Sequence, residues 1–142
     1  MKKREPLIRS RSGHKLFEVE DLWHFDGADL RGASLSGFDL TGFHAWRTDL
    51  TDADLSGSDL YWCGLYETRF ERADLRGTRF NGGFLEQVDF SFARLQGADF
   101  GLDNLSGMTW IEACDFNCAE YDSATVWPAG FDPQLAGMIE VS

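Results

Sequence analysis

The sequence has few prolines, few cysteines and few positive charges. Only 3 prolines accompany 15 glycines in 142 residues, which excludes a proline-rich linker and a collagen-like chain. The 13 Lys and Arg are outnumbered by 24 Asp and Glu, so the cationic footprint that a simple nucleic-acid binder needs is missing at a formal net charge of −11. No long apolar run is present, and we expect no membrane span. The length favours one domain, and a hydrophobic content of 43% argues against disorder.

The three cysteines, Cys63, Cys114 and Cys118, are an odd number without paired spacings. They suggest no disulfide framework, and we therefore predict a reducing compartment. Residues 2–4 are basic, like the start of a secretory signal, but charged residues rather than an apolar run follow them, which excludes such a signal. The sequence thus favours a cytoplasmic protein.

Large apolar residues recur at every fifth position over most of the chain. In the register from residue 25 to residue 110, seventeen of eighteen positions hold a large apolar residue, which we call the centre of its unit, and Ala45 is the exception. The residue two before each centre is mostly small, the residue before it is mostly polar, and the residue two after it is often glycine. After Trp110 one residue is inserted, and the period resumes at Phe116, Tyr121 and Val126. A period of five fits neither a helix nor a strand, and predicts short extended segments joined by sharp turns.

Several units resemble the consensus of the pentapeptide repeat proteins. They read ADLRG at residues 28–32, ADLSG at 53–57, ADLRG at 73–77 and ADF at 98–100, and residues 124–133 are similar to a tail seen on many such proteins. The resemblance covers residues 23–127 and implies an all-β solenoid, a right-handed quadrilateral β-helix with four units in each coil. We predict an N-terminal tail and hairpin cap in residues 1–22, turning at Ser12 and Gly13, the β-helix in residues 23–127, and a C-terminal cap segment in residues 128–142.

The family geometry stacks residues that are twenty apart and so predicts four columns of centres, one on each face. The four columns are Leu30, Leu50, Phe70, Phe90 and Trp110; Leu35, Leu55, Leu75 and Leu95; Leu40, Leu60, Phe80 and Phe100; and Phe25, Ala45, Leu65, Leu85 and Leu105. We expect the phenylalanines of the first and third columns to stack and to stiffen the C-terminal half.

Some residues depart from the pattern of the repeat or follow its end. Phe38, Phe43 and Asp103 occupy positions where small residues belong, so we expect their units to be distorted. We expect a short helix to start at Asp132 and Pro133. The last coil should be sealed by Trp127, Phe131, Leu135 and Met138.

Aromatic and imidazole side chains gather on the outer surface of the fourth face and at the corner before it. The predicted outward residues are His24, His44, Trp46, Tyr66 and Phe84 on the face, and Tyr61 and Trp62 at the corner. Single surface aromatics need no explanation, whereas a group of them indicates an interface. We therefore predict a protein interaction site formed by His44, Trp46, Tyr61, Trp62, Tyr66 and Phe84. The partner is either a protein that the sequence does not identify or a second copy of the chain in a homodimer.

The acidic charge suggests an alternative function. Residues 1–20 hold six Lys and Arg against three Glu, so the remainder holds seven cations against twenty-one acids, a net charge of −14. Some members of the resembled family are acidic DNA mimics that bind type II topoisomerases, so the resemblance permits such a modulator. However, an Asp directly before a centre commonly accepts a hydrogen bond from the turn backbone, so it serves the fold. In addition, a belt of arginines interrupts the negatively charged surface and should pair with Asp49, Asp59, Asp89 and Asp99. The belt is Arg69, Arg72, Arg76 and Arg79.

No catalytic, cofactor or metal site emerges from the sequence. Cys114 and Cys118 lack the second pair that a zinc site needs, and His24 and His44 lack a third ligand. Cys63 and Cys114 fall on inward positions and are interpreted as core thiols. We therefore predict a non-catalytic scaffold without cofactor or metal, which binds neither nucleic acid nor a membrane.

Overall fold

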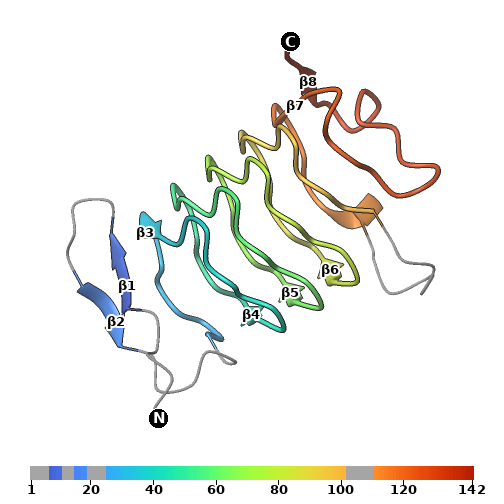
Figure 1. The fold of residues 1–142 in the computed structure, drawn as a ribbon. Helices are drawn as coiled ribbons and strands as arrows, with labels where there is room; N and C mark the ends of the chain where they lie inside the picture. Colours follow the sequence, from blue (N-terminus) through green and yellow to red (C-terminus); the bar gives the residue numbers. More distant parts are fainter. Residues whose placement is uncertain (1–6, 11–14, 19–24, 102–110) are drawn as a thin grey trace.

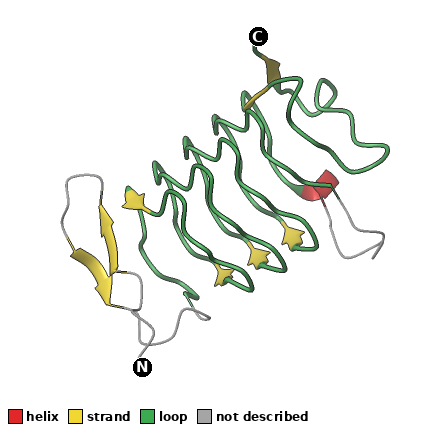
Figure 2. Cartoon of the chain, in the orientation of Figure 1, coloured by secondary structure: helices red, strands yellow, loops and turns green. Residues whose placement is uncertain are grey.

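The structure, a computed structural model, describes residues 7–10, 15–18, 25–101 and 111–142. Over these residues the chain winds through short extended segments and turns into coils that are stacked along one axis (Figure 1). Figure 2 shows how short the strands are relative to the connecting turns. The predictions that concern Ser12, Gly13, His24, Asp103, Leu105 and Trp110 lie outside the described residues.

The strands form three small sheets. Strands β1 (Leu7–Ser10) and β2 (Lys15–Glu18) pair antiparallel as a hairpin, and β1 also pairs antiparallel with β3 (Ala33–Ser34) of the first coil. Strands β4 (His44–Trp46), β5 (Gly64–Tyr66) and β6 (Phe84–Glu86) form a parallel sheet. A single 3-10 turn, η1 (Ile111–Ala113), precedes the parallel pair of β7 (Glu120–Tyr121) and β8 (Ile139–Glu140).

Residues twenty apart stack, as predicted, through most of the solenoid. In the parallel sheet His44 pairs with Gly64 and Gly64 with Phe84. Isolated parallel bridges continue the same register on the other faces, for example between Asp54 and Asp74. Each coil therefore contains four five-residue units, and each unit pairs with the units one coil before and after it.

The corners are tight turns that require a left-handed residue. The N–H of Ala28 donates to the carbonyl of Phe25 at 2.9 Å, and the same bond recurs after most centres. The residue two after a centre has a positive φ, which is 72° at Gly27 and is the geometry that the second central residue of a type II turn needs. Glycine is frequent there for this reason, but eight other residues adopt the same conformation: Arg47, Asp52, Trp62, Glu67, Arg72, Gln87, Phe92 and Cys118.

Two columns of aromatic rings fill the C-terminal half of the core, which confirms the predicted stacking. The ring centroids of Phe70 and Phe90 are 5.5 Å apart and those of Phe80 and Phe100 are 4.6 Å apart, in both cases with nearly parallel planes. The two columns meet edge to face, as at Phe80 and Phe90, where the centroids are 5.8 Å apart and the planes cross at 88°. Each ring thus has aromatic neighbours both along its column and across the core.

The predicted register is wrong after Phe100. The ring of Phe116 stacks on that of Phe90, with centroids 4.9 Å apart, and the ring of Trp127 stacks on that of Phe100 at 5.1 Å. Val126, predicted as a centre, is instead 47% exposed. The bridges explain the change, because Asp89 pairs with Asp115, 26 residues on, and Asp99 with Val126, 27 residues on. Compared with a regular twenty-residue coil, the chain therefore has six extra residues before Phe116 and one further extra residue before Trp127. The prediction had only one extra residue in total.

The units of Phe38 and Phe43 are not distorted. The N–H of Phe38 donates to the Leu35 carbonyl at 3.3 Å and that of Phe43 to the Leu40 carbonyl at 2.8 Å, as in regular turns. Phe43 is buried, with its ring centroid 4.8 Å from that of Phe25. The space comes from Ala45, the one small centre, which lies two residues further along the same unit.

Three of the four residues predicted to seal the last coil pack against it. The ring of Phe131 lies 4.8 Å from that of Trp127 and 5.4 Å from that of Phe116, and Met138 is buried. Leu135 does not join them, because it is 87% exposed. Instead of the predicted helix, the segment after Asp132 forms turns, in which the N–H of Ala136 donates to the carbonyl of Asp132 at 3.2 Å.

Candidate functional site

The candidate site lies on the fourth face, which we define as the outer surface of the sheet β4–β5–β6 with its two flanking corners. The centres Ala45, Leu65 and Leu85 point into the core and are buried. Because side chains alternate along an extended segment, the residues on either side of each centre point outward. One outward column is therefore His44, Gly64 and Phe84, and the other is Trp46, Tyr66 and Glu86.

Three of the predicted site residues form a cluster of rings on the surface. Trp46, which is 46% exposed, lies with its ring centroid 4.7 Å from that of His44 and 6.0 Å from that of Tyr66. Gly64 makes this arrangement possible, because a Cβ atom there would lie 3.0 Å from Cδ2 of His44. Oδ1 of Asp26 accepts a hydrogen bond from the Trp46 N–H at 3.0 Å and lies 3.1 Å from Nδ1 of His44. The cluster is thus held by the coil before it.

The other three predicted residues share the face but not the cluster. Trp62 is 59% exposed at the corner, and its ring lies against Gly82, where a Cβ atom would be 3.2 Å from it. Tyr61 lies beneath the guanidinium of Arg79, which is 6.0 Å from the ring centroid and donates to Oη at 3.3 Å. Phe84 is half-buried on β6. Among the residues that the structure describes, no ring contact joins these three to the cluster.

An arginine and a carboxylate border the cluster at the next corner. Nε of Arg47 donates to the Glu67 carboxylate at 2.8 Å, and the guanidinium lies 5.9 Å from the centroid of the Tyr66 ring. Hydrogen bonds from Arg47 and then Tyr66 lower the pKa of Glu67, and the nearby Glu67 carboxylate raises the pKa of Tyr66. The Tyr66 ring therefore already has a cation over one face.

Most of the aspartates that directly precede a centre form hydrogen bonds within their own corner turn. The carboxylate before a centre accepts the backbone N–H two residues on, as Asp49 does from Thr51 at 3.0 Å and Asp54 from Ser56 at 3.0 Å. At Asp29 the side chain of Arg31 adds two further bonds and lowers the pKa of the carboxylate to about 2. The acidic columns are thus part of the corner structure, as predicted.

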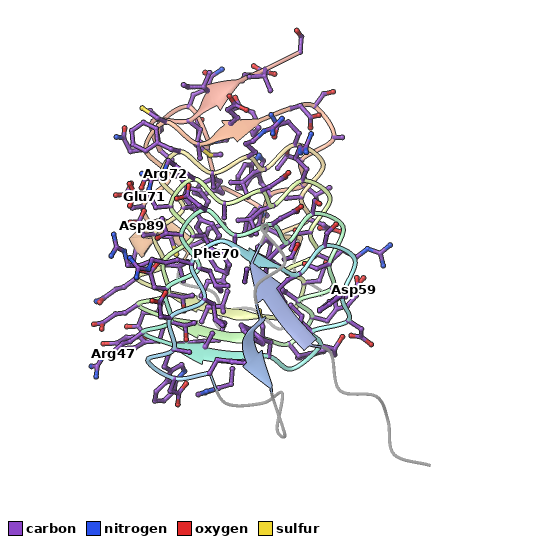
Figure 3. All side chains as sticks on the ribbon, turned by 90° about the vertical axis from the view of Figure 1, so that its left-hand side faces the viewer. Arg47, Asp59, Phe70, Glu71, Arg72 and Asp89 are labelled. Atoms are coloured by element: carbon purple, nitrogen blue, oxygen red, sulfur yellow. The ribbon has the colours of Figure 1, made fainter. Side chains whose placement is uncertain are left out.

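The predicted arginine belt pairs with carboxylates, but not always with those expected. Arg69 lies 3.7 Å from Asp49 and Arg79 lies 3.7 Å from Asp59, as predicted. The pairs expected with Asp89 and Asp99 do not form among the described residues. Arg72 instead pairs with Asp52 and Glu71, and Arg76 with Asp74. In Figure 3, Arg47, Glu71 and Arg72 project from one side of the solenoid and Asp59 from the other, with Phe70 inside.

Among the described residues, no three His, Cys, Asp or Glu gather as metal ligands. The three cysteines form no disulfide bond with one another. Burial raises the pKa of the Cys63 and Cys114 thiols to about 12, in agreement with their interpretation as core thiols. In the same part of the chain, no helix is long and apolar enough to span a membrane.

Sequence reasoning missed one exposed aromatic residue. Phe92 is 52% exposed at the corner after Phe90 and has a φ of 59°. Its signal was its position two after a centre, where the turn points the side chain away from the core. Phe92 lies at a corner between the first and second faces and is therefore not part of the fourth face.

A known pentapeptide repeat protein of solved structure shares the fold of this chain. A pentapeptide repeat protein from the thylakoid lumen of Arabidopsis thaliana is 22% identical with a TM-score of 0.63, over 72% of this chain and 68% of that one. A pentapeptide repeat protein from Nostoc PCC 7120 is 24% identical with a TM-score of 0.37, over 80% and 84%. The plasmid-mediated fluoroquinolone resistance protein QnrB1 is 18% identical with a TM-score of 0.41, over 82% and 78%. No curated protein matches the chain.

The family itself is shown by a sequence model. Eight copies of the pentapeptide repeat match residues 24–65 and 68–107. These residues make up more than half of the chain, and they include β4, β6 and the first two residues of β5. The chain therefore belongs to the pentapeptide repeat family, whose structures imply a quadrilateral β-helix.

Proposed function

We propose that the protein is a non-catalytic scaffold that binds another protein through its fourth face. The observation that carries this proposal is the ring cluster, in which Trp46 contacts His44 and Tyr66 and still exposes 46% of its surface. Tryptophan, tyrosine and arginine dominate the energetics of protein interfaces, and the two aromatic residues bury a large area while few torsions are frozen. The fourth face offers all three, since Arg47 borders the cluster.

The backbone of Trp62 supports the same proposal. Its φ of 56° lies in the left-handed region, where a side chain costs about 1–2 kcal/mol and glycine costs almost nothing. The ring is nevertheless 59% exposed, so burial repays little of this cost. Phe92 has the same two features at a corner of other faces, so Trp62 supports the proposal because it combines them with a place on the fourth face, beside the ring cluster.

The alternative, a DNA mimic that modulates a type II topoisomerase or another nucleic-acid enzyme, has less support. A mimic needs an unbroken stripe of free negative charge. Here carboxylates before the centres bind the amides of their own turns, and arginines such as Arg69 and Arg79 interrupt the columns.

We also infer how the solenoid is wound and ended. Connections between parallel strands of one sheet are almost always right-handed, which favours a right-handed coil.

Stacked coils expose strand edges at both ends. We propose that the hairpin β1–β2, which pairs with β3, and residues 128–142 cover these edges. The three cysteines form no disulfide bond with one another, which favours a reducing compartment, so we propose a cytoplasmic protein.

The test combines two substitutions, Trp46→Ala and Trp62→Gly. Tagged wild-type protein is used to capture partners from an extract of the native host, and each captured protein is identified, purified and titrated by calorimetry. We expect the double variant to bind at least tenfold more weakly, since two exposed aromatic anchors are removed. Its stability to urea should be equal or higher, because glycine relieves the left-handed strain at residue 62.

Phe92→Gly is the matched control, since it also removes an exposed aromatic from a left-handed corner but on other faces. We expect it to bind as wild type does. Sedimentation velocity of the same three proteins tests the homodimer, which would dissociate in the double variant only. A double variant that folds and keeps both its partners and its association state would overturn the proposal.

A further inference from the structure

We infer that the partner meets the fourth face with arginine or lysine side chains on a peptide segment that runs along the solenoid axis. This inference rests on the proposed function and adds the chemistry of the partner to it. Three observations carry it: the order of side chains in one outward column, an internal arginine that already uses the site, and the charge balance of the solenoid.

The outward column places two aromatic rings between two carboxylates. Trp46, Tyr66 and Glu86 are in register on β4, β5 and β6, and Asp26 lies one coil before Trp46 and binds its N–H at 3.0 Å. The order along the axis is therefore acid, tryptophan, tyrosine, acid. A cation over the face of a tryptophan or tyrosine ring is attracted to it, and a carboxylate at either end strengthens that attraction.

Arg47 is an example, within this molecule, of a cation that contacts both an aromatic ring and a carboxylate on the fourth face. Its guanidinium lies 5.9 Å from the Tyr66 centroid while its Nε binds the Glu67 carboxylate at 2.8 Å. Trp46 likewise has a ring beside a carboxylate, since Oδ1 of Asp26 accepts the Trp46 N–H and lies 3.1 Å from Nδ1 of His44. Trp46, however, has no arginine over its ring among the described residues.

The charge balance leaves this column short of cations. Each of the seven arginines that follow residue 20 forms an ion pair with a carboxylate of the solenoid. Glu86 forms none among the described residues, and residues 102–110 contain no Lys or Arg that could supply one. The net charge of −14 after residue 20 also steers basic partners toward the solenoid.

The spacing of the column fits a peptide segment. Asp26 and Glu86 are three coils apart, which is about 14 Å at the spacing of neighbouring strands. In an extended peptide two side chains that are four residues apart are separated by about 13 Å. One segment can therefore place a cation near each carboxylate while its backbone passes over the rings of Trp46 and Tyr66.

The test uses a defined probe, an acetylated and amidated glycine peptide with two arginines four residues apart. Its binding is followed through the indole N–H signal of Trp46 in a 1H–15N spectrum, which is assigned by its loss in Trp46→Ala. We expect a saturable shift with the arginine peptide and none with a peptide that has glutamate in place of arginine. Raising the salt to about 0.5 M should weaken the binding, because exposed charges are then screened.

Glu86→Gln tests the carboxylate, and Glu140→Gln on the exposed strand β8 is its control, because both remove one negative charge. We expect at least a threefold rise in the dissociation constant for Glu86→Gln and no change for Glu140→Gln. If the two variants weaken binding equally, or if the Trp46 signal does not respond to the arginine peptide, this inference is wrong. The proposed function would still stand if Trp46→Ala with Trp62→Gly releases the native partner, and both fall if it does not.

Discussion

Phe43 and Ala45 have exchanged the sizes that the repeat normally assigns to their positions. Both point into the core and are buried, but here the residue two before the centre is large and the centre is small. The ring of Phe43 lies 4.8 Å from that of Phe25, one coil away. Because cores are packed to a nearly constant density, the volume added at one position is compensated at the other. The local turn therefore stays regular.

This exchange predicts a strong coupling between the two residues. Phe43→Ala should destabilise the protein by about 3–5 kcal/mol through the cavity it leaves, and Ala45→Leu by about 1–3 kcal/mol through overpacking. The double variant restores the usual pattern of the repeat and should be less destabilised than Phe43→Ala alone. Urea denaturation of the four proteins measures the cycle, and additive costs would show that the two positions do not share space.

At the scale of the structural elements, carboxylates stabilise many of the corner turns by accepting hydrogen bonds. Asp74 is the most enclosed of them, with its side chain 11% exposed. It accepts the N–H of Arg76 at 3.2 Å and two bonds from the Arg76 guanidinium, and these interactions lower the pKa of Asp74. A carboxylate with a lowered pKa in the folded protein stabilises it above the ordinary pKa of about 3.9, and that stabilisation is lost as the pH falls toward the folded value.

Asp74→Asn should therefore change the acid sensitivity of the protein. At pH 7 we expect the variant to be destabilised by about 1–3 kcal/mol, because a charge-assisted bond is lost. Between pH 4 and pH 2.5 wild type should lose more stability than the variant, which no longer has this carboxylate to protonate. Asp54→Asn on the same face is the control, since Asp54 binds a serine hydroxyl in place of an arginine. Equal pH profiles for the two variants would contradict this role of Asp74.

An element of this fold could be predicted from the sequence where the residues that determine it lie within its own five-residue unit. Each unit carries its own turn signal and its own inward residue, so the stacking of Leu55 on Leu35 follows from the period together with the four-unit coil that the family resemblance implies. The partner of Phe90 does not, because Trp110 and Phe116 both continue the apolar pattern and only packing selects Phe116. Leu135 was misplaced for a similar reason, since beyond the repeat no period says which apolar residues face inward.

The candidate site likewise has features that follow from the repeat and features that depend on packing between coils. The outward direction of Trp46 and Tyr66 follows from their places beside the centres, and was predicted. That His44 leans over Gly64 to meet Trp46, while Trp62 covers Gly82 instead, depends on neighbouring coils and side-chain rotamers. Phe92 occupies the same corner position as Trp62, but it stands alone between the first and second faces, where no group of aromatic residues indicates a site.

The whole molecule is a stack in which each coil contacts only its neighbours, so its stability varies along the axis. The C-terminal half contains two interlocked columns of rings, from Phe70 and Phe80 to Phe116 and Trp127. The coils before Phe70 have leucines in the same two columns. Aromatic pairs contribute about 0.5–1.5 kcal/mol each beyond the area they bury, so the aromatic half should open less often than the leucine half.

Native-state hydrogen exchange measures this difference directly. We expect the amides of Phe70 and Phe90, whose N–H groups bind the coil that follows, to exchange more slowly than those of Leu30 and Leu35. Phe90→Leu removes the ring that contacts both columns, and should accelerate exchange around residues 70–116 more than around residues 25–40. Uniform exchange along the chain, or equal acceleration in both halves, would instead mean that the solenoid opens as one cooperative unit, in which the aromatic columns stabilise all coils alike.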